Sequence, residues 1–350
     1  MLFSMLRYHT TMFSVLRPLF GVFVCSTLAF AQTKDFTLRV EVPVVSLDVS
    51  VTTETGQPVE GLTPEDFEIY ENGVRQDIRY FGSSTAPYHV YLLFDSSGST
   101  RHKWNFMRRA VAGLLGYVKP QDRISIGIFD GGLETLTEWD DPREEALGAL
   151  DPLVTERESG GTTEFYKSLE KVLEKSFSDI RERRAVIVLT DGRDTSLYRE
   201  IIRRNRVMDS VEDRRFRGLF KAAGKEGIPV HFIAINTDRN IEGNTRGADE
   251  YRNLQFIYKN SAVPEQYLEQ VRERMEKVAE VSGGRVLFPR TIEDVIPLYE
   301  EIGKDLGRAY SLGYVPATET PGEGLRRIVV RVGNEEYQIL QSRAGYYAKQ

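Results

Sequence analysis

The sequence predicts an α/β fold in which a doubly wound, mostly parallel sheet is inserted into a β-sandwich built from both ends of the chain. Short, continuous apolar runs such as "HVYLLFD" and "AVIVLTD" are typical of strands that are buried on both faces. Segments with apolar residues at helical spacing lie between these runs, and this alternation favours a parallel sheet covered by helices. The flanking regions have the pattern of strands, and each is too small to bury a core alone.

Residues 36–84 form the predicted N-terminal part of the sandwich, and residues 308–348 complete it. "FTLRVEVPVVSLDVSVTT" is rich in valine and alternates, as a half-buried strand does. Asn72-Gly73 is a typical two-residue hairpin turn. "AYSLGYVP", "LRRIVVRVG" and "YQILQSRAGYY" supply the C-terminal strands. Because marginal sheets need a second layer, we expect one shared sandwich; two independent β appendages are the alternative.

The α/β domain is predicted at residues 86–307. "WNFMRRAVAGLLGYV" and "EFYKSLEKVLEKSF" predict helices at 104–118 and 164–177, and two more helices are expected between residue 266 and the end of the domain. Residues 236–266 are polar and follow a strand at the expected ligand edge, so they are interpreted as a recognition loop or a solvated insertion. A second, charged insertion follows Asp191.

The composition and the N-terminus bear on location and partners. The 350 residues carry a formal net charge of −6, which argues against nucleic acid as a partner. Two arginines precede the uncharged run "LFGVFVCSTLAFA", so residues 1–31 are predicted to be a signal peptide; an uncleaved anchor is the alternative. Cleavage would remove Cys25, the only cysteine, and with it any disulfide or thiolate metal site. We expect a periplasmic or extracellular protein without a membrane span in its mature chain.

Oxygen-bearing side chains gather where two of the predicted strands end. The strands that end in Asp95 and Asp191 are expected neighbours at the point where strand order reverses, which is where such sheets bind ligands. Two carboxylates and three hydroxyls suit a hard cation, Mg²⁺ first and then Mn²⁺ or Ca²⁺. An outside oxygen, such as a partner's aspartate or glutamate, would complete the coordination. The candidate metal ligands are Asp95, Ser97, Ser99, Thr162 and Asp191.

The stretches "DSSGS" (95–99), "GT" (161–162) and "LTDG" (189–192) together resemble the metal-ion-dependent adhesion site (MIDAS) of von Willebrand factor type A (VWA) domains. Phrases along nearly the whole mature chain, including "GGRVLFP" and "YSLGYVP", are similar to a bacterial secreted family described as VWFA-related. The resemblance implies a VWA, Rossmann-like fold and a non-enzymatic binding or adhesion module. It implies that Asp191 often ligates through water and the other four ligands directly or through water. Thr100 and the charged insertion depart from the family pattern.

Catalytic sites are predicted to be absent. A serine hydrolase needs the G-x-S-x-G elbow, and residues 95–99 lack its first glycine. The four histidines are interpreted as packing or surface residues, and no P-loop with its Gly-Lys-Ser/Thr is present. Metal-assisted hydrolysis and a structural envelope protein whose ion only braces the fold are the two alternatives to ligand binding.

Overall fold

The structure is a computed structural model that describes residues 44–55, 57–83, 86–97, 104–116, 118–151, 162–180, 183–235, 246–317, 325–341 and 345–347. These residues belong to one compact unit, Val42–Gln350. The predicted signal peptide lies outside the described residues. Among the helices that the structure does describe, none combines the length and the apolar character that crossing a membrane requires.

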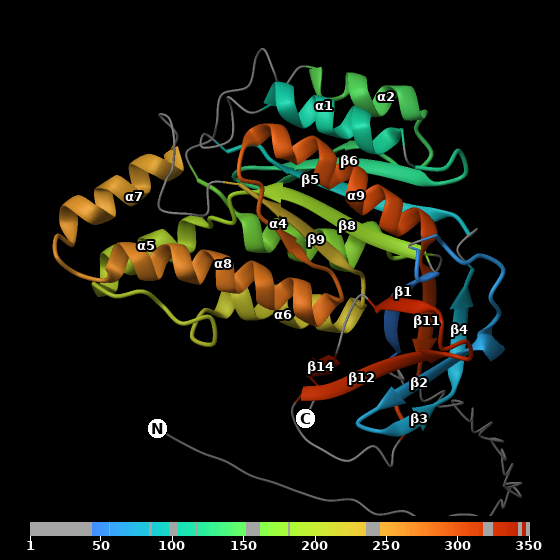
Figure 1. Cartoon of the computed structure of the whole chain (residues 1–350). Helices are drawn as coiled ribbons and strands as arrows, with labels where there is room; N and C mark the ends of the chain where they lie inside the picture. Colours follow the sequence, from blue (N-terminus) through green and yellow to red (C-terminus); the bar gives the residue numbers. More distant parts are fainter. Residues whose placement is uncertain are drawn as a thin grey trace, which may run out of the picture. The chain divides into compact units, whose positions relative to one another are not determined.

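A six-stranded sheet forms the centre of the α/β domain (Figure 1). The order across the sheet is β10-β9-β8-β5-β6-β7, and all neighbours are parallel except the edge strand β7. Chain order reverses at β5, so the carboxyl ends of β5 and β8 lie side by side, which confirms the predicted doubly wound sheet. The strands are β5 (Tyr88–Asp95), β6 (Arg123–Phe129), β7 (Leu133–Thr137), β8 (Arg183–Thr190), β9 (Val230–Ala234) and β10 (Val286–Leu287).

Helices cover both faces of this sheet, which explains why its strands are apolar at nearly every position. Val90, Leu92 and Phe94 of β5 pack towards α1, α2 and α9, whereas Tyr91 and Leu93 pack towards α4, α6 and α8. A π-helical turn, Val172–Ser176, extends α4. The helices are α1 (Trp104–Leu115), α2 (Arg143–Gly148), α4 (Phe165–Lys171), α5 (Thr195–Arg204), α6 (Arg214–Glu226), α7 (Arg246–Ile257), α8 (Val263–Ser282) and α9 (Val295–Arg308).

Two antiparallel sheets, ordered β13-β1-β11-β4 and β14-β12-β2-β3, combine strands from both ends of the chain. Leu47 of β1 lies opposite Leu312 of β11, and Ile69 of β2 lies opposite Val330 of β12. The four side chains share one core, which confirms the shared sandwich. The strands are β1 (Val45–Thr52), β2 (Phe67–Glu71), β3 (Val74–Gln76), β4 (Ile78–Gly82), β11 (Tyr310–Tyr314), β12 (Leu325–Val332), β13 (Gln338–Gln341) and β14 (Gly345–Tyr347).

A buried carboxylate ties the two sheets of the sandwich together. Glu71, at the end of β2, is fully buried. It accepts hydrogen bonds from Arg326 Nη1 at 2.7 Å and from the Tyr314 hydroxyl of the opposite sheet at 2.6 Å. The next two residues, Asn72 and Gly73, both have positive φ, 49° and 85°, as the predicted tight hairpin turn requires.

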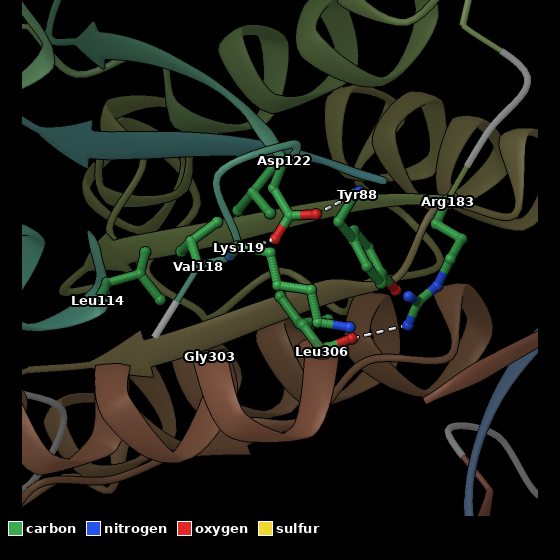
Figure 2. Close-up of a pocket in the computed structure, with 9 residues that line it drawn as sticks. Tyr88, Leu114, Val118, Lys119, Asp122, Arg183, Gly303 and Leu306 are labelled. Atoms are coloured by element: carbon green, nitrogen blue, oxygen red, sulfur yellow. Dashed lines mark hydrogen bonds between the residues drawn. The ribbon is translucent and has the colours of Figure 1, made fainter. Parts of the chain in front are cut away.

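One buried arginine closes the base of the α/β domain (Figure 2). Arg183, the first residue of β8, is 4% exposed, and its guanidinium lies 4.3 Å from the centre of the Tyr88 ring. It donates to Leu306 O at 2.6 Å, to Ala309 O, and to Ala86 O at 3.1 Å. Ala86 and Ala309 adjoin the two points where the chain passes between sandwich and α/β domain. The Arg183 side chain therefore hydrogen-bonds to both connections between the sandwich and the α/β domain.

The two segments interpreted as a loop and an insertion both contain helices. Residues 246–257 form α7, because Tyr251 and Leu254 share a helical face and are buried in the core. The charged segment after Asp191 begins with α5, which Asp194 caps by accepting from Ser196 N at 2.8 Å. The sequence did not predict these two helices, because both segments are polar and the few apolar side chains that each buries do not make a clear helical pattern.

Candidate metal centre

Asp95 is the last residue of β5, and its carboxylate is fully buried at the strand end. Oδ1 accepts a hydrogen bond from Ser97 N at 3.0 Å, and Oδ2 accepts one from Thr190 Oγ1 at 2.8 Å. Thr190 is the last residue of the adjacent strand β8. These two bonds fix the orientation of the carboxylate, and the Ser97 side chain adds a further interaction with it.

Asp191 follows β8 directly and is also fully buried. Gly192, at φ 72°, turns the chain sharply after it, so that Arg193 N donates to Asp191 Oδ1 at 3.1 Å. Arg193 Nη1 lies 2.8 Å from Asp191 Oδ2, but the pair is not aligned for a hydrogen bond. Oδ2 is thus a buried carboxylate oxygen whose partner in the described part of the chain is the Arg193 guanidinium, in an ion pair.

The loops that carry the other candidate ligands are bonded to one another along the carboxyl edge of the sheet. Ser96 N and Ser96 Oγ both donate to Phe129 O, at 2.8 and 2.9 Å. Thr163 N donates to Thr195 Oγ1 at 2.7 Å, and Glu164 N donates to Asp130 O at 2.7 Å. The segment that begins at Thr162 is therefore linked to the loops after β6 and β8.

The structure brings four of the five candidate ligands to this one edge. Ser97 is 2% exposed and follows Asp95 in the turn. The Oγ1 atom of Thr162 lies beside Gly131, where an added Cβ would be 3.3 Å from it. Ser99, the fifth candidate, lies outside the described residues. The assignment of all five as metal ligands stays a prediction.

The two buried carboxylates at neighbouring strand ends repel each other, so a positive charge placed between them would be stabilising. Burial, and after it the proximity of Asp191, raises the pKa of the Asp95 carboxyl to about 7, because both effects disfavour a second buried negative charge. The described residues contain no cluster of three or more His, Cys, Asp or Glu side chains. A cation here would be held by two carboxylates and neutral hydroxyls, a donor set that fits hard divalent ions.

Sequence reasoning missed two residues of this edge. Thr190 donates to Asp95 and joins the two strand ends. Arg193 is 4% exposed and forms an ion pair with Asp191. Both adjoin Asp191 in the sequence, and that adjacency was the only available signal. An arginine in a strongly charged segment is usually exposed, so nothing local indicated that Arg193 would be buried.

Comparisons with known proteins found one family model and several solved structures that are similar to this chain. The family model of the von Willebrand factor type A domain matches residues 89–279. A von Willebrand factor type A structure from Catenulispora acidiphila is 10% identical, covers 88% of this chain and 75% of that chain, and has a TM-score of 0.44. Proximal thread matrix protein 1 from the mussel byssus is 18% identical, with a TM-score of 0.40 and 63% of this chain covered. No curated protein matches.

The matched part spans about half of the mussel protein, 48% of its chain. Another structure of that protein has a zinc-occupied MIDAS motif. BatB from Bacteroides thetaiotaomicron is 14% identical, with a TM-score of 0.38 and coverage of 62% of this chain and 98% of that chain. At these identities the similarity concerns the fold alone.

Proposed function

The chain belongs to the von Willebrand factor type A family, and from this premise we propose that it is a metal-dependent binding protein. Its carboxyl sheet edge holds one divalent cation, Mg²⁺ first, and captures a protein or cell-surface ligand through an aspartate or glutamate of that ligand. Asp95, Ser97, Ser99, Thr162 and Asp191 are the residues that would hold the ion. When bound, the cation supplies an electrophilic position for a carboxylate oxygen.

The observation that supports this proposal best is the pair of buried carboxylates at adjacent strand ends. Asp95 and Asp191 are both fully buried, and Asp191 Oδ2 has no aligned hydrogen-bond donor in the described part of the chain. Two buried carboxylates repel each other, and Arg193 balances only one of the two negative charges, so a bound divalent ion would relieve the repulsion that remains. Only neutral hydroxyls accompany the carboxylates in the ligand set, which would leave the ion able to attract a further anionic oxygen.

Cation binding is tested by calorimetric titration and by thermal unfolding with Mg²⁺, Mn²⁺, Ca²⁺ and Zn²⁺. Asp95→Ala should abolish both the binding heat and the stabilisation, which reaches about 2.7 kcal/mol at one hundred times the dissociation constant. Asp213→Asn is the matched control, because Asp213 is a buried carboxylate that pairs with Arg274 at 2.7 Å. That variant should lose stability and still respond to the cation. A wild-type protein indifferent to all four ions would sink the proposal.

Ligand capture is tested by affinity purification from envelope and culture fractions, with and without EDTA. The wild type should retain a ligand that EDTA releases and that Asp95→Ala never retains. A cation that stabilises the fold without any EDTA-sensitive ligand would favour the structural reading instead. Hydrolysis of model esters or phosphoesters that depends on the cation and on Asp95 would identify a hydrolase.

We propose, finally, that residues 1–31 direct export to the periplasm or beyond the cell. The supporting observation is the uncharged run that ends in Ala29-Phe30-Ala31, a small-x-small cleavage signal. Mass spectrometry of the protein from its native host should find an N-terminus at Gln32. A full-length protein in the cytoplasmic fraction would contradict this proposal.

A further inference from the structure

Arg193 places a permanent positive charge at the candidate metal centre. Its side chain is 5% exposed, that of Asp191 is 1% exposed, and Nη1 lies 2.8 Å from Asp191 Oδ2. Burial alone would lower the pKa of this guanidinium, but Asp191, Tyr267 and Glu250 together raise it. The group therefore stays charged at every physiological pH.

The guanidinium is held from two sides. Its backbone N–H donates to Asp191 Oδ1 at 3.1 Å, and Gly192 between them packs so closely on Met275 that an added Cβ would lie 2.8 Å from it. On the other side, the fully buried Tyr267 of α8 donates to Glu250 of α7 at 3.0 Å, and both groups act electrostatically on Arg193. The positive charge is thus part of the fold at the sheet edge.

Arg193 changes the charge that a divalent ion meets at this edge. With both carboxylates ionised, Asp95, Asp191 and Arg193 together carry a charge of −1 without the ion and +1 with it; Glu250, which also acts on Arg193, is not part of this sum. A site with the same two carboxylates and no arginine would pass from −2 to zero. Since like charges repel strongly where water is excluded, the guanidinium opposes the cation and favours an incoming anion.

We propose that Arg193 is a built-in counter-ion that weakens cation binding and makes the loaded centre selective for an anionic ligand. This inference rests on the proposed function and specifies its regulation. The cation and the ligand carboxylate bind cooperatively, because the cation attracts the carboxylate and the carboxylate offsets the repulsion between the cation and Arg193. Such coupling is reciprocal, so each of the two raises the affinity for the other by the same factor. Without the cation, Asp191 is paired with Arg193. With the cation bound, a carboxylate of the ligand completes the coordination and balances the positive charge.

The test is Mn²⁺ affinity, measured by calorimetry and by electron paramagnetic resonance of the free ion. Arg193→Gln should bind Mn²⁺ at least about tenfold more tightly than the wild type, whereas Arg193→Lys, which retains the charge, should stay within about threefold of it. Arg274→Gln is the matched control, because Arg274 on α8 is also buried and pairs with Asp213, the N-cap residue of α6. It should destabilise the fold and leave the Mn²⁺ affinity unchanged.

A second measurement uses acetate as the probe for a ligand carboxylate. Mn²⁺ affinity is compared in acetate and chloride at equal ionic strength, with the binding of Mn²⁺ by acetate alone subtracted. Acetate should raise the affinity of the wild type more than that of Arg193→Gln. If Arg193→Gln folds poorly, Mn²⁺ should restore its melting temperature more than it raises that of the wild type, which reports the same tightened affinity.

The outcomes separate this inference from the proposed function. If the wild type binds Mn²⁺ and Arg193→Gln binds it equally or more weakly, the counter-ion role is overturned and the cation site stands. Weaker binding by both Arg193→Gln and Arg193→Lys would make Arg193 a positioning residue for Asp191. If none of the three proteins binds Mn²⁺, the proposed function fails as well.

Discussion

Replacing Arg183 with methionine should destabilise the whole protein from the side of the sheet opposite the candidate metal centre. Methionine retains much of the aliphatic stem and removes the donors to three backbone carbonyls. The carbonyls of Leu306 and Ala309 belong to the end of α9 and to the residue after it, where no helical donor follows. The cavity beside Arg183, about 10 Å³, has room for about one water molecule, so solvent replaces these donors poorly.

The size of the effect follows from those two buried acceptors. An unsatisfied buried polar group costs about 1 to 3 kcal/mol, so two of them imply a loss of about 2 to 6 kcal/mol in the free energy of unfolding. Urea unfolding followed by far-UV circular dichroism measures this loss. Arg184→Met is the matched control, since Arg184 is the next residue, is half-buried and reaches Glu226 O only at 3.5 Å. A loss below about 1 kcal/mol for Arg183→Met, or equal losses for the two variants, would refute the reasoning.

Two further predictions concern buried ionisable groups away from the candidate centre. Glu71→Ala should cost about 3 kcal/mol or more in urea unfolding, because it leaves the donors of Arg326, Tyr314 and Tyr346 without their shared buried acceptor; a near-neutral variant would contradict the role of Glu71. Burial, and then Arg285, lowers the pKa of His231 to about 3, and neither ring nitrogen has a hydrogen-bond partner among the described residues. The unfolded chain therefore takes up a proton below about pH 6.5 that the folded chain refuses, so stability is lost as the pH falls. His231→Phe should remove about 2 kcal/mol of the loss between pH 7.5 and 5.0, and identical pH profiles for the two proteins would rule this out.

The central sheet could be predicted from the sequence because each of its strands needs only a run of consecutive apolar residues, which is visible in the sequence itself. A strand covered on both faces needs an apolar side chain at nearly every position, and "YHVYLLFD" and "RRAVIVLT" satisfy that requirement before any contact is known. The hairpin turn at Asn72-Gly73 was equally local, since two consecutive residues with positive φ require such residue types. Asp95 and Asp191 also stand at strand ends that the alternation of strands and helices makes neighbours.

Helix α7 was not predictable in this way. Its segment is polar, and among the side chains described for this helix Tyr251 and Leu254, three residues apart, mark the buried face. Helical periodicity needs more apolar positions than these to stand out from a loop. The neighbouring α8 decides the conformation, because it offers the surface on which those two side chains pack.

The sequence by itself determined the alternation of strands and helices around the central sheet, the strand-forming character of both flanks and the positions of two carboxylates at neighbouring strand ends, because each of these follows from residue type and spacing along the chain. Only the tertiary structure decided where the long cationic side chains go. Arg183 reaches the end of α9 and Arg193 reaches Asp191, although both stand in charged segments that resemble solvated surface. A long, flexible side chain has many partners within reach, and packing from distant elements selects one of them.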